Sequence, residues 1–153
     1  MEHGFTGIKK KLGFGVMRLP KIGEEVDIPA VTTMVDAFMQ AGFNYFDTAR
    51  PYLQGQSEQA IKICVAQRYP RESFVLTNKL SNSCFEKEED IRPFFQSQLE
   101  ACGVEYFDFY LMHAMNAKSH EKYQATHAYD VAQQLKAEGK IRHVGFSFHD
   151  TAE

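Results

Sequence analysis

The sequence has few cysteines, and they are not arranged for a disulfide framework or a metal site. Its 153 residues contain three, namely Cys64, Cys84 and Cys102. Their odd number and wide spacing favour free thiols in a reducing, cytoplasmic setting. No Cys-x-x-Cys pair is present, so neither a zinc site nor an iron–sulfur site is predicted.

The sequence also lacks a strong charge of either sign and a long apolar run. Its formal net charge is −3 at pH 7, which gives no electrostatic reason to expect a nucleic acid or an anionic membrane as partner. The short basic run Lys9 to Lys11 is typical of a solvated turn. No stretch has the length of a membrane span, and the N-terminus lacks a signal-peptide core.

What the sequence does contain is a regular alternation of strand and helix patterns. Glycines and prolines separate short apolar runs from longer segments with helical spacing. The strands are expected at residues 12–17, 43–46, 74–77, 107–112 and 141–148, and the helices at 27–41, 57–69, 86–102 and 121–138. Residues 1–11 are expected to form a small hairpin and residues 21–27 a polar loop.

Strict alternation with connections of this length predicts parallel strands joined by right-handed crossovers. Two architectures fit, a doubly wound open sheet and a (β/α)8 TIM barrel. A full barrel takes about 250 residues, so residues 1–153 are expected to form one domain that is only the N-terminal part of a barrel, with about five strands and four helices. The open sheet is disfavoured because no phosphate-binding glycine turn and helix follow the first strand.

Four polar residues fall at equivalent places, near the carboxyl ends of successive strands: Asp47, Tyr52, Lys79 and His113. In a parallel sheet these ends meet at one edge. Tyrosine is a poor acid near pH 7, because its unperturbed pKa is about 10. A nearby ammonium stabilises the phenolate, a carboxylate holds that ammonium, and a histidine can donate to a substrate oxygen. Taken alone, each residue is more simply structural; together they favour acid–base chemistry at a carbonyl.

The motifs around these residues resemble the aldo-keto reductase family. They are Phe46-Asp47-Thr48-Ala49, Tyr52, Gly55 to Glu58, Thr77-Asn78-Lys79 and Asp108 to His113, with Leu12 to Pro20 and Val144 to Ser147 similar to that family's first and fifth strands. The resemblance implies a TIM barrel and NADPH-dependent reduction of aldehydes or ketones to alcohols. It also implies roles: Tyr52 as general acid/base, Lys79 as the group that modulates its pKa, Asp47 as the partner of Lys79, and His113 as the group that orients the carbonyl. Met17, Arg18, Asp47 and Ser147 would contact the cofactor.

The sequence departs from the family pattern in two respects. Phe148, followed by His149, stands where the family commonly has Asn after the serine. The sequence around these two residues resembles a bacterial branch of the family whose members often carry a C-terminal iron–sulfur-type extension. The family's last three strands, with most of the groups that hold the dinucleotide phosphates, would lie beyond Glu153, so the chain is expected to be a fragment of an oxidoreductase. The alternative is a non-catalytic half-barrel module that self-associates through its open edges or binds a partner chain.

Overall fold

The computed structural model describes residues 7–151. The strands are β1 (Gly13–Gly15), β2 (Lys21–Ile22), β3 (Glu25–Val26), β4 (Tyr45–Asp47), β5 (Val75–Leu80), β6 (Phe107–Met115) and β7 (Ile141–Phe148). The α-helices are α1 (Ile28–Gln40), α2 (Gln56–Ile61), α3 (Glu88–Cys102), α4 (Ala117–Ala125) and α5 (Ala128–Ala137), and a π-helical turn, Lys62–Ala66, continues α2. Short 3-10 turns lie at Tyr52–Gly55, Arg71–Ser73 and Asn82–Cys84. Within residues 7–151, no helix is long and apolar enough to cross a membrane.

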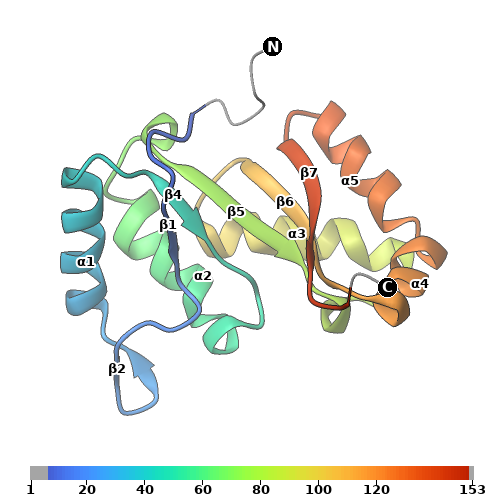
Figure 1. Cartoon of the computed structure of the whole chain (residues 1–153), viewed down its shortest axis with the longest axis horizontal. Coiled ribbons are helices and arrows are strands. Elements are labelled where there is room, and N and C mark those ends of the chain that lie inside the picture. The colour runs from blue at the N-terminus through green and yellow to red at the C-terminus, as the bar shows by residue number, and fades with distance from the viewer. Residues whose placement is uncertain (1–6, 152–153) are drawn as a thin grey trace.

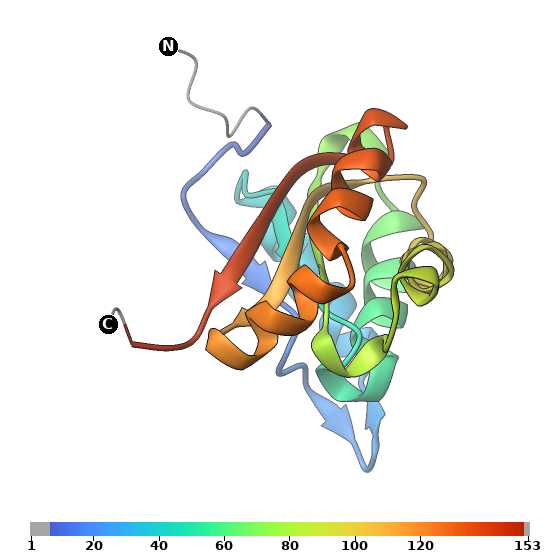
Figure 2. The ribbon, with the colours of Figure 1, turned by 90° about the vertical axis from the view of Figure 1, so that its right-hand side faces the viewer.

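A five-stranded sheet in the order β1-β4-β5-β6-β7 forms the centre of the molecule (Figure 1). All four strand pairings are parallel, as the alternation predicts. The helices gather on one face of this curved sheet, and no described helix covers the opposite face (Figure 2). The carboxyl ends of the strands therefore share one edge of a half-open structure.

Helices α1 and α3 begin and end at signals that the sequence supplies. The Asp27 side chain accepts from Ala30 N at 3.1 Å to start α1, and Gly42 follows its end with a φ of 83°. The first turn of α3 is acidic, which suits the positive end of its helix dipole, and Gly103 ends it with a φ of 67°. These signals are local, which is why the sequence alone reveals them.

Two expectations about the N-terminal region are wrong or untestable. The hairpin is formed by β2 and β3, in the segment predicted to be a polar loop, through antiparallel pairing of Lys21 with Val26 and of Ile22 with Glu25. Gly23 makes its turn with a φ of 61°. Of the hairpin expected within residues 1–11, residues 1–6 lie outside the described part, and residues 7–11 contain no strand.

The helix expected over residues 121–138 is instead two helices. His127 has a φ of 49°, which interrupts the helix between α4 and α5. The break lets α4 place Tyr123 against the ends of β5 and β6, while α5 buries Val131 and Leu135 against the sheet. Tertiary packing on two surfaces overrides a continuous helical pattern that has no glycine or proline at this point.

Ser57 does not cap the helix that follows the Tyr52 loop. Gly55, with a φ of 90°, precedes α2, and Ser57 lies inside the helix. The buried Ser57 hydroxyl is 2.7 Å from the Thr48 hydroxyl. It therefore ties the start of α2 to the residue after β4.

Candidate active site

The structure brings Asp47, Tyr52, Lys79 and His113 together at the carboxyl edge of the sheet. Asp47 is the last residue of β4, whereas Lys79 and His113 lie inside β5 and β6, which run further than the sequence predicted. Register pairs Asp47 with Thr77 and Leu80 with Met112. Lys79 lies two residues beyond Thr77 on β5, and His113 lies one residue beyond Met112 on β6.

Lys79 is the most buried member of the group. Its ammonium lies 2.5 Å from Asp47 Oδ1 and donates to Thr48 O at 2.9 Å. It also lies over the Tyr52 ring, 4.8 Å from the centroid. The ammonium therefore contacts a carboxylate on one side and the phenol ring on the other. Among the described residues, the Tyr52 hydroxyl makes no hydrogen bond to Lys79, and the contact between the two side chains is that of the ammonium with the ring.

Tyr52 projects from a loop with an uncommon backbone. Leu53 and Gln54 have φ values of 51° and 55°, in the left-handed region, and Gly55 continues it. Non-glycine residues in this region store local strain and cluster at functional sites. The turn directs the Tyr52 hydroxyl at His113, whose Nε2 is 3.5 Å away, with the two rings edge-to-face.

His113 is held from its other ring nitrogen. Its Nδ1 lies 2.6 Å from the Ser81 hydroxyl. Burial, helped by the nearby charge of Lys79 and by His149, lowers the pKa of His113 from 6.5 to about 4. The imidazole is therefore neutral near pH 7 and suited to hydrogen bonding.

The residues expected to contact a cofactor lie along the same edge. Met17 and Arg18 follow β1 and are exposed. No described hydrogen bond or ion pair links Arg18 to the other site residues. Ser147, in β7, accepts from Ala114 N at 2.8 Å, so its hydroxyl also fixes the bulge that follows His113.

Comparison with known proteins decides which family this arrangement represents. The family model described as the aldo/keto reductase family matches residues 11–153. The chain belongs to the aldo-keto reductase family.

The similarities to individual family members are moderate in identity and close in structure. The chain is 31% identical over 132 residues to an aldo-keto reductase of Mycolicibacterium smegmatis, covering 84% of this chain and 46% of that protein. It matches the aldo-keto reductase of Bacillus halodurans (holo form) with a TM-score of 0.75 and 27% identity, covering 92% of this chain and 46% of that one. The aldo-keto reductase of Klebsiella pneumoniae, solved in complex with NADPH, gives a TM-score of 0.73 and 25% identity, with 91% and 45% covered.

These matches confirm the predicted fold as part of a TIM barrel. The chain spans about half the length of the curated relatives it matches. Five parallel strands with helices on one face fit part of an eight-stranded barrel.

A buried polar network behind Lys79 was not predicted from the sequence. Glu58, fully buried, accepts from Arg50 Nε, from Asn78 Nδ2 at 2.9 Å and from Gln98 Nε2 at 3.1 Å. Gln98 Nε2 is also 3.0 Å from Lys79 O, while Lys79 N donates to Asn78 Oδ1 at 2.8 Å. Both backbone polar groups of Lys79 are therefore held by side-chain amides.

The end of β4 explains why Lys79 needs these amides. Thr48 N donates to Thr77 O, so Thr77 directs its backbone groups toward β4, and Lys79, two residues on, faces the same way. The pairing of β4 with β5 ends at Asp47 and Thr77, which leaves Lys79 without a strand partner on that side. One signal was available in the sequence: Gln98 interrupts the apolar stripe formed by Ile91, Phe95 and Cys102 on α3.

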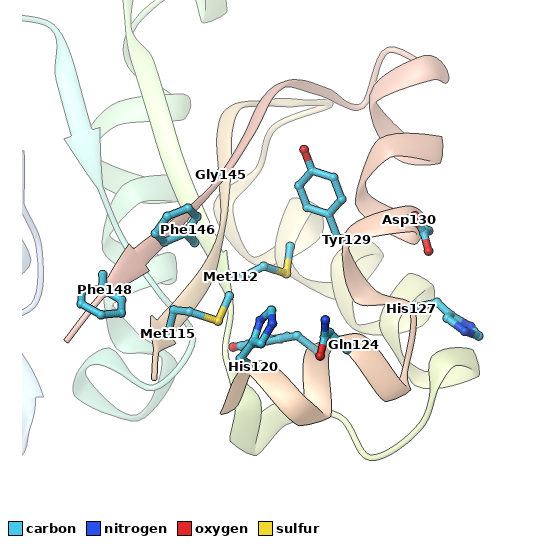
Figure 3. Close-up of a pocket in the computed structure, with 11 residues that line it drawn as sticks. Met112, Met115, His120, Gln124, His127, Tyr129, Asp130, Gly145, Phe146 and Phe148 are labelled. Carbon is cyan, nitrogen blue, oxygen red and sulfur yellow. The ribbon is translucent and has the colours of Figure 1, made fainter. Parts of the chain in front are cut away.

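A cavity of about 630 Å³ lies away from these residues, between β7 and the pair α4 and α5 (Figure 3). Its lining is mainly apolar and includes Met112, Met115, Phe146 and Phe148. None of the four clustered polar residues lines it. The candidate active site is therefore distinguished by its converging polar groups and not by the size of this cavity.

Proposed function

We propose that the chain carries the acid–base half of an NADPH-dependent reductase that converts aldehydes or ketones to alcohols. The observation that supports this most directly is the geometry of Lys79. Its ammonium is fixed between Asp47 and the Tyr52 ring, and the Tyr52 hydroxyl points to neutral His113. This arrangement suits proton donation to an oxygen that gains negative charge.

The carboxyl edge is open beside β1, where the nicotinamide would lie in this proposal. A Cβ placed on Gly15 would meet no atom within 4 Å, and Met17 and Arg18 beside it are exposed. Arg18 offers a cation for a phosphate, and Ser147 a hydroxyl for an amide. When bound, the reduced nicotinamide supplies the hydride that reaches the carbonyl carbon.

Tyr52 supplies the proton that completes the reduction. Its O–H bond breaks as a new O–H bond forms on the carbonyl oxygen, and the resulting phenolate is stabilised by the Lys79 ammonium. His113 donates a hydrogen bond that fixes the carbonyl oxygen beside Tyr52. Solvent then returns a proton to Tyr52, and the reverse sequence oxidises an alcohol.

Replacing Tyr52 with Phe tests this function. Tyr52→Phe keeps the ring over Lys79 and removes only the proton donor, so we expect carbonyl reduction to fall by roughly 10²- to 10⁴-fold with little change in cofactor affinity. NADPH consumption with a panel of aldehydes measures the first quantity, and calorimetric titration the second. Tyr129→Phe, at an exposed tyrosine on α5, is the matched control and should be unaffected.

Two results would count against the proposal. An unchanged turnover in Tyr52→Phe would remove Tyr52 from the acid role. No NADPH consumption with any aldehyde, by this chain or by one extended to the length of its relatives, would remove the reductase function altogether.

A second candidate function is a non-catalytic module that pairs with another copy of itself. Phe146, Phe148 and Tyr129 are each more than half exposed beside the cavity next to β7 (Figure 3). β7 is also an edge strand, whose free backbone groups can pair with another chain. Association that survives Tyr52→Phe, in a chain that never consumes NADPH, would favour this candidate over the enzyme.

A further inference from the structure

Ser81 makes one hydrogen bond with its side chain among the described residues, and that bond goes to His113. The hydroxyl lies 2.6 Å from Nδ1, and the residue as a whole is only 3% exposed. Ser81 is not among the residues that the sequence pattern assigns to the site. It is the first residue after β5, and its backbone is extended, with φ −88° and ψ 133°.

The contact between Ser81 and His113 is set by the fold, because the backbone of both residues is held in place. The last pair of β5 with β6 is Leu80 with Met112, and Ser81 and His113 are the residues that directly follow this pair on the two segments. The Tyr123 hydroxyl, from α4, lies 2.7 Å from Leu80 O and 2.9 Å from His113 O. It bridges the two strand ends and keeps their separation fixed.

The direction of the hydrogen bond follows from how Ser81 is buried. Nδ1 of a neutral imidazole either donates to the serine oxygen or accepts from its hydroxyl. In the first case the Ser81 proton would have no described protein acceptor and could turn only to the cavity that Ser81 and His113 both line, whereas in the second case it is paired directly with Nδ1. The second case satisfies both groups and places the ring proton on Nε2.

We propose that Ser81 is a positioning residue that holds His113 as the Nε2-protonated tautomer. Nε2 is the nitrogen that faces the Tyr52 hydroxyl, so its N–H points to where the carbonyl oxygen binds in the proposed reaction. The opposite tautomer would present a lone pair there and would compete with the carbonyl for the Tyr52 proton. The catalytic part of this inference rests on the proposed function, whereas the tautomer does not.

The tautomer can be measured without any activity. Long-range proton–nitrogen NMR spectra of the chain labelled with ¹⁵N-histidine, at pH 7, distinguish the two ring nitrogens. The signals of His113 are those that vanish in His113→Gln. We expect a single Nε2-protonated form in the unaltered chain and a mixture of both tautomers in Ser81→Ala.

Two further variants distinguish a positioning role of Ser81 from a general disturbance of the loop. Ser81→Thr keeps the hydroxyl and an extended backbone and should restore the single tautomer. Ser83→Ala, at an exposed serine of the same loop, should leave the spectrum unchanged. An Nδ1-protonated His113 in the unaltered chain, or the same tautomer in Ser81→Ala as in the unaltered chain, would overturn the proposal.

Where carbonyl reduction is measurable, Ser81→Ala should lower kcat/KM roughly tenfold, the value of one hydrogen bond, with unchanged NADPH affinity. Ser81→Thr should recover it. If no carbonyl is reduced, the proposed function fails while the NMR result still decides the role of Ser81. If reduction is normal in Ser81→Ala although the tautomer shifts, Ser81 fixes the tautomer but the reaction does not depend on it, which overturns the catalytic part.

Discussion

At the scale of single residues, Lys79 has the partners that a buried cation requires. Its side chain is 5% exposed, and its ammonium meets a carboxylate, a carbonyl and an aromatic face. Leaving water is costly for an ammonium, and the charge of Asp47 offsets that cost. The same carboxylate therefore supports both the fold and the charge next to Tyr52.

We expect Asp47→Asn to lower the stability of the fold and to weaken the contact that holds the Lys79 ammonium next to Tyr52. The amide keeps the shape of the side chain but removes its charge, so the buried ammonium loses its counter-ion. Because Asp47 itself is partly exposed, we expect a loss of about 2 kcal/mol in unfolding free energy, less than for a fully buried pair. Urea unfolding measures the loss. Asp27→Asn is the matched control, because Asn caps a helix as well as Asp; an equal loss in both variants would refute the ion-pair argument.

His113 predicts how stability responds to acid. Its folded pKa is lowered from 6.5 to about 4, so between these values the unfolded chain binds a proton that the folded chain does not. The stabilisation is therefore complete above pH 6.5 and is lost as the pH falls toward 4. The unfolding free energy, measured at a series of pH values, should change less steeply with pH in this window for His113→Gln than for the unaltered chain. Because other groups titrate there too, only the difference between the two proteins is diagnostic; identical slopes would contradict the lowered pKa.

At the scale of elements, α3 supports β5 at the point where β4 ends. Gln98 on α3 reaches Lys79 O, Asn78 Oδ1 and Glu58 Oε1, and it accepts from the Tyr110 hydroxyl at 2.6 Å. We expect Gln98→Leu, which keeps the volume but leaves these groups unpaired, to cost about 3 kcal/mol of unfolding free energy. Gln96→Leu, on the exposed face of α3, should change it by less than about 0.5 kcal/mol. Thermal or urea unfolding of both variants would test this. Similar losses of unfolding free energy in the two variants would mean that the network contributes little to stability.

The order of the elements was predictable from the sequence because their signals are local. Asp27, Gly42 and Gly103 sit at helix ends that any fold would need to cap. The break at His127 and the β2–β3 hairpin were not predictable in this way. Both depend on what the segment packs against, which a helical or loop pattern does not contain.

The residues of the candidate site divide in the same way, into those that the sequence predicts and those that depend on packing. Asp47, Lys79 and His113 were found because parallel strands bring their carboxyl ends to one edge. Ser81 and Gln98 were not, because their importance arises from the exact register of β5 with β6 and from the early end of β4. A serine after a strand and a glutamine in a helix carry no such information on their own.

At the scale of the whole molecule, the described structure presents two uncovered surfaces. One is the face of the sheet without helices, where Tyr45, Phe109 and His143 form a row of ring contacts. The other is the apolar surface beside β7, with Phe146 and Phe148. Exposed apolar surface next to an open strand edge favours association.

We therefore expect the 153-residue chain, expressed alone, to bind NADPH weakly and to self-associate. It spans about half the length of its relatives, and the family resemblance places most phosphate-binding groups in the other half. Charge-assisted phosphate contacts supply much of the affinity for a dinucleotide, so the nicotinamide end alone should hold it poorly. Fluorescence titration with NADPH and light scattering measure the two properties.

Phe146→Lys should reduce association, whereas Ile63→Lys, at an exposed residue distant in sequence from β7, should not. Tight binding by a monomer would show that the cofactor site is complete within this chain, and tight binding only by a dimer would mean that two half barrels complete one another.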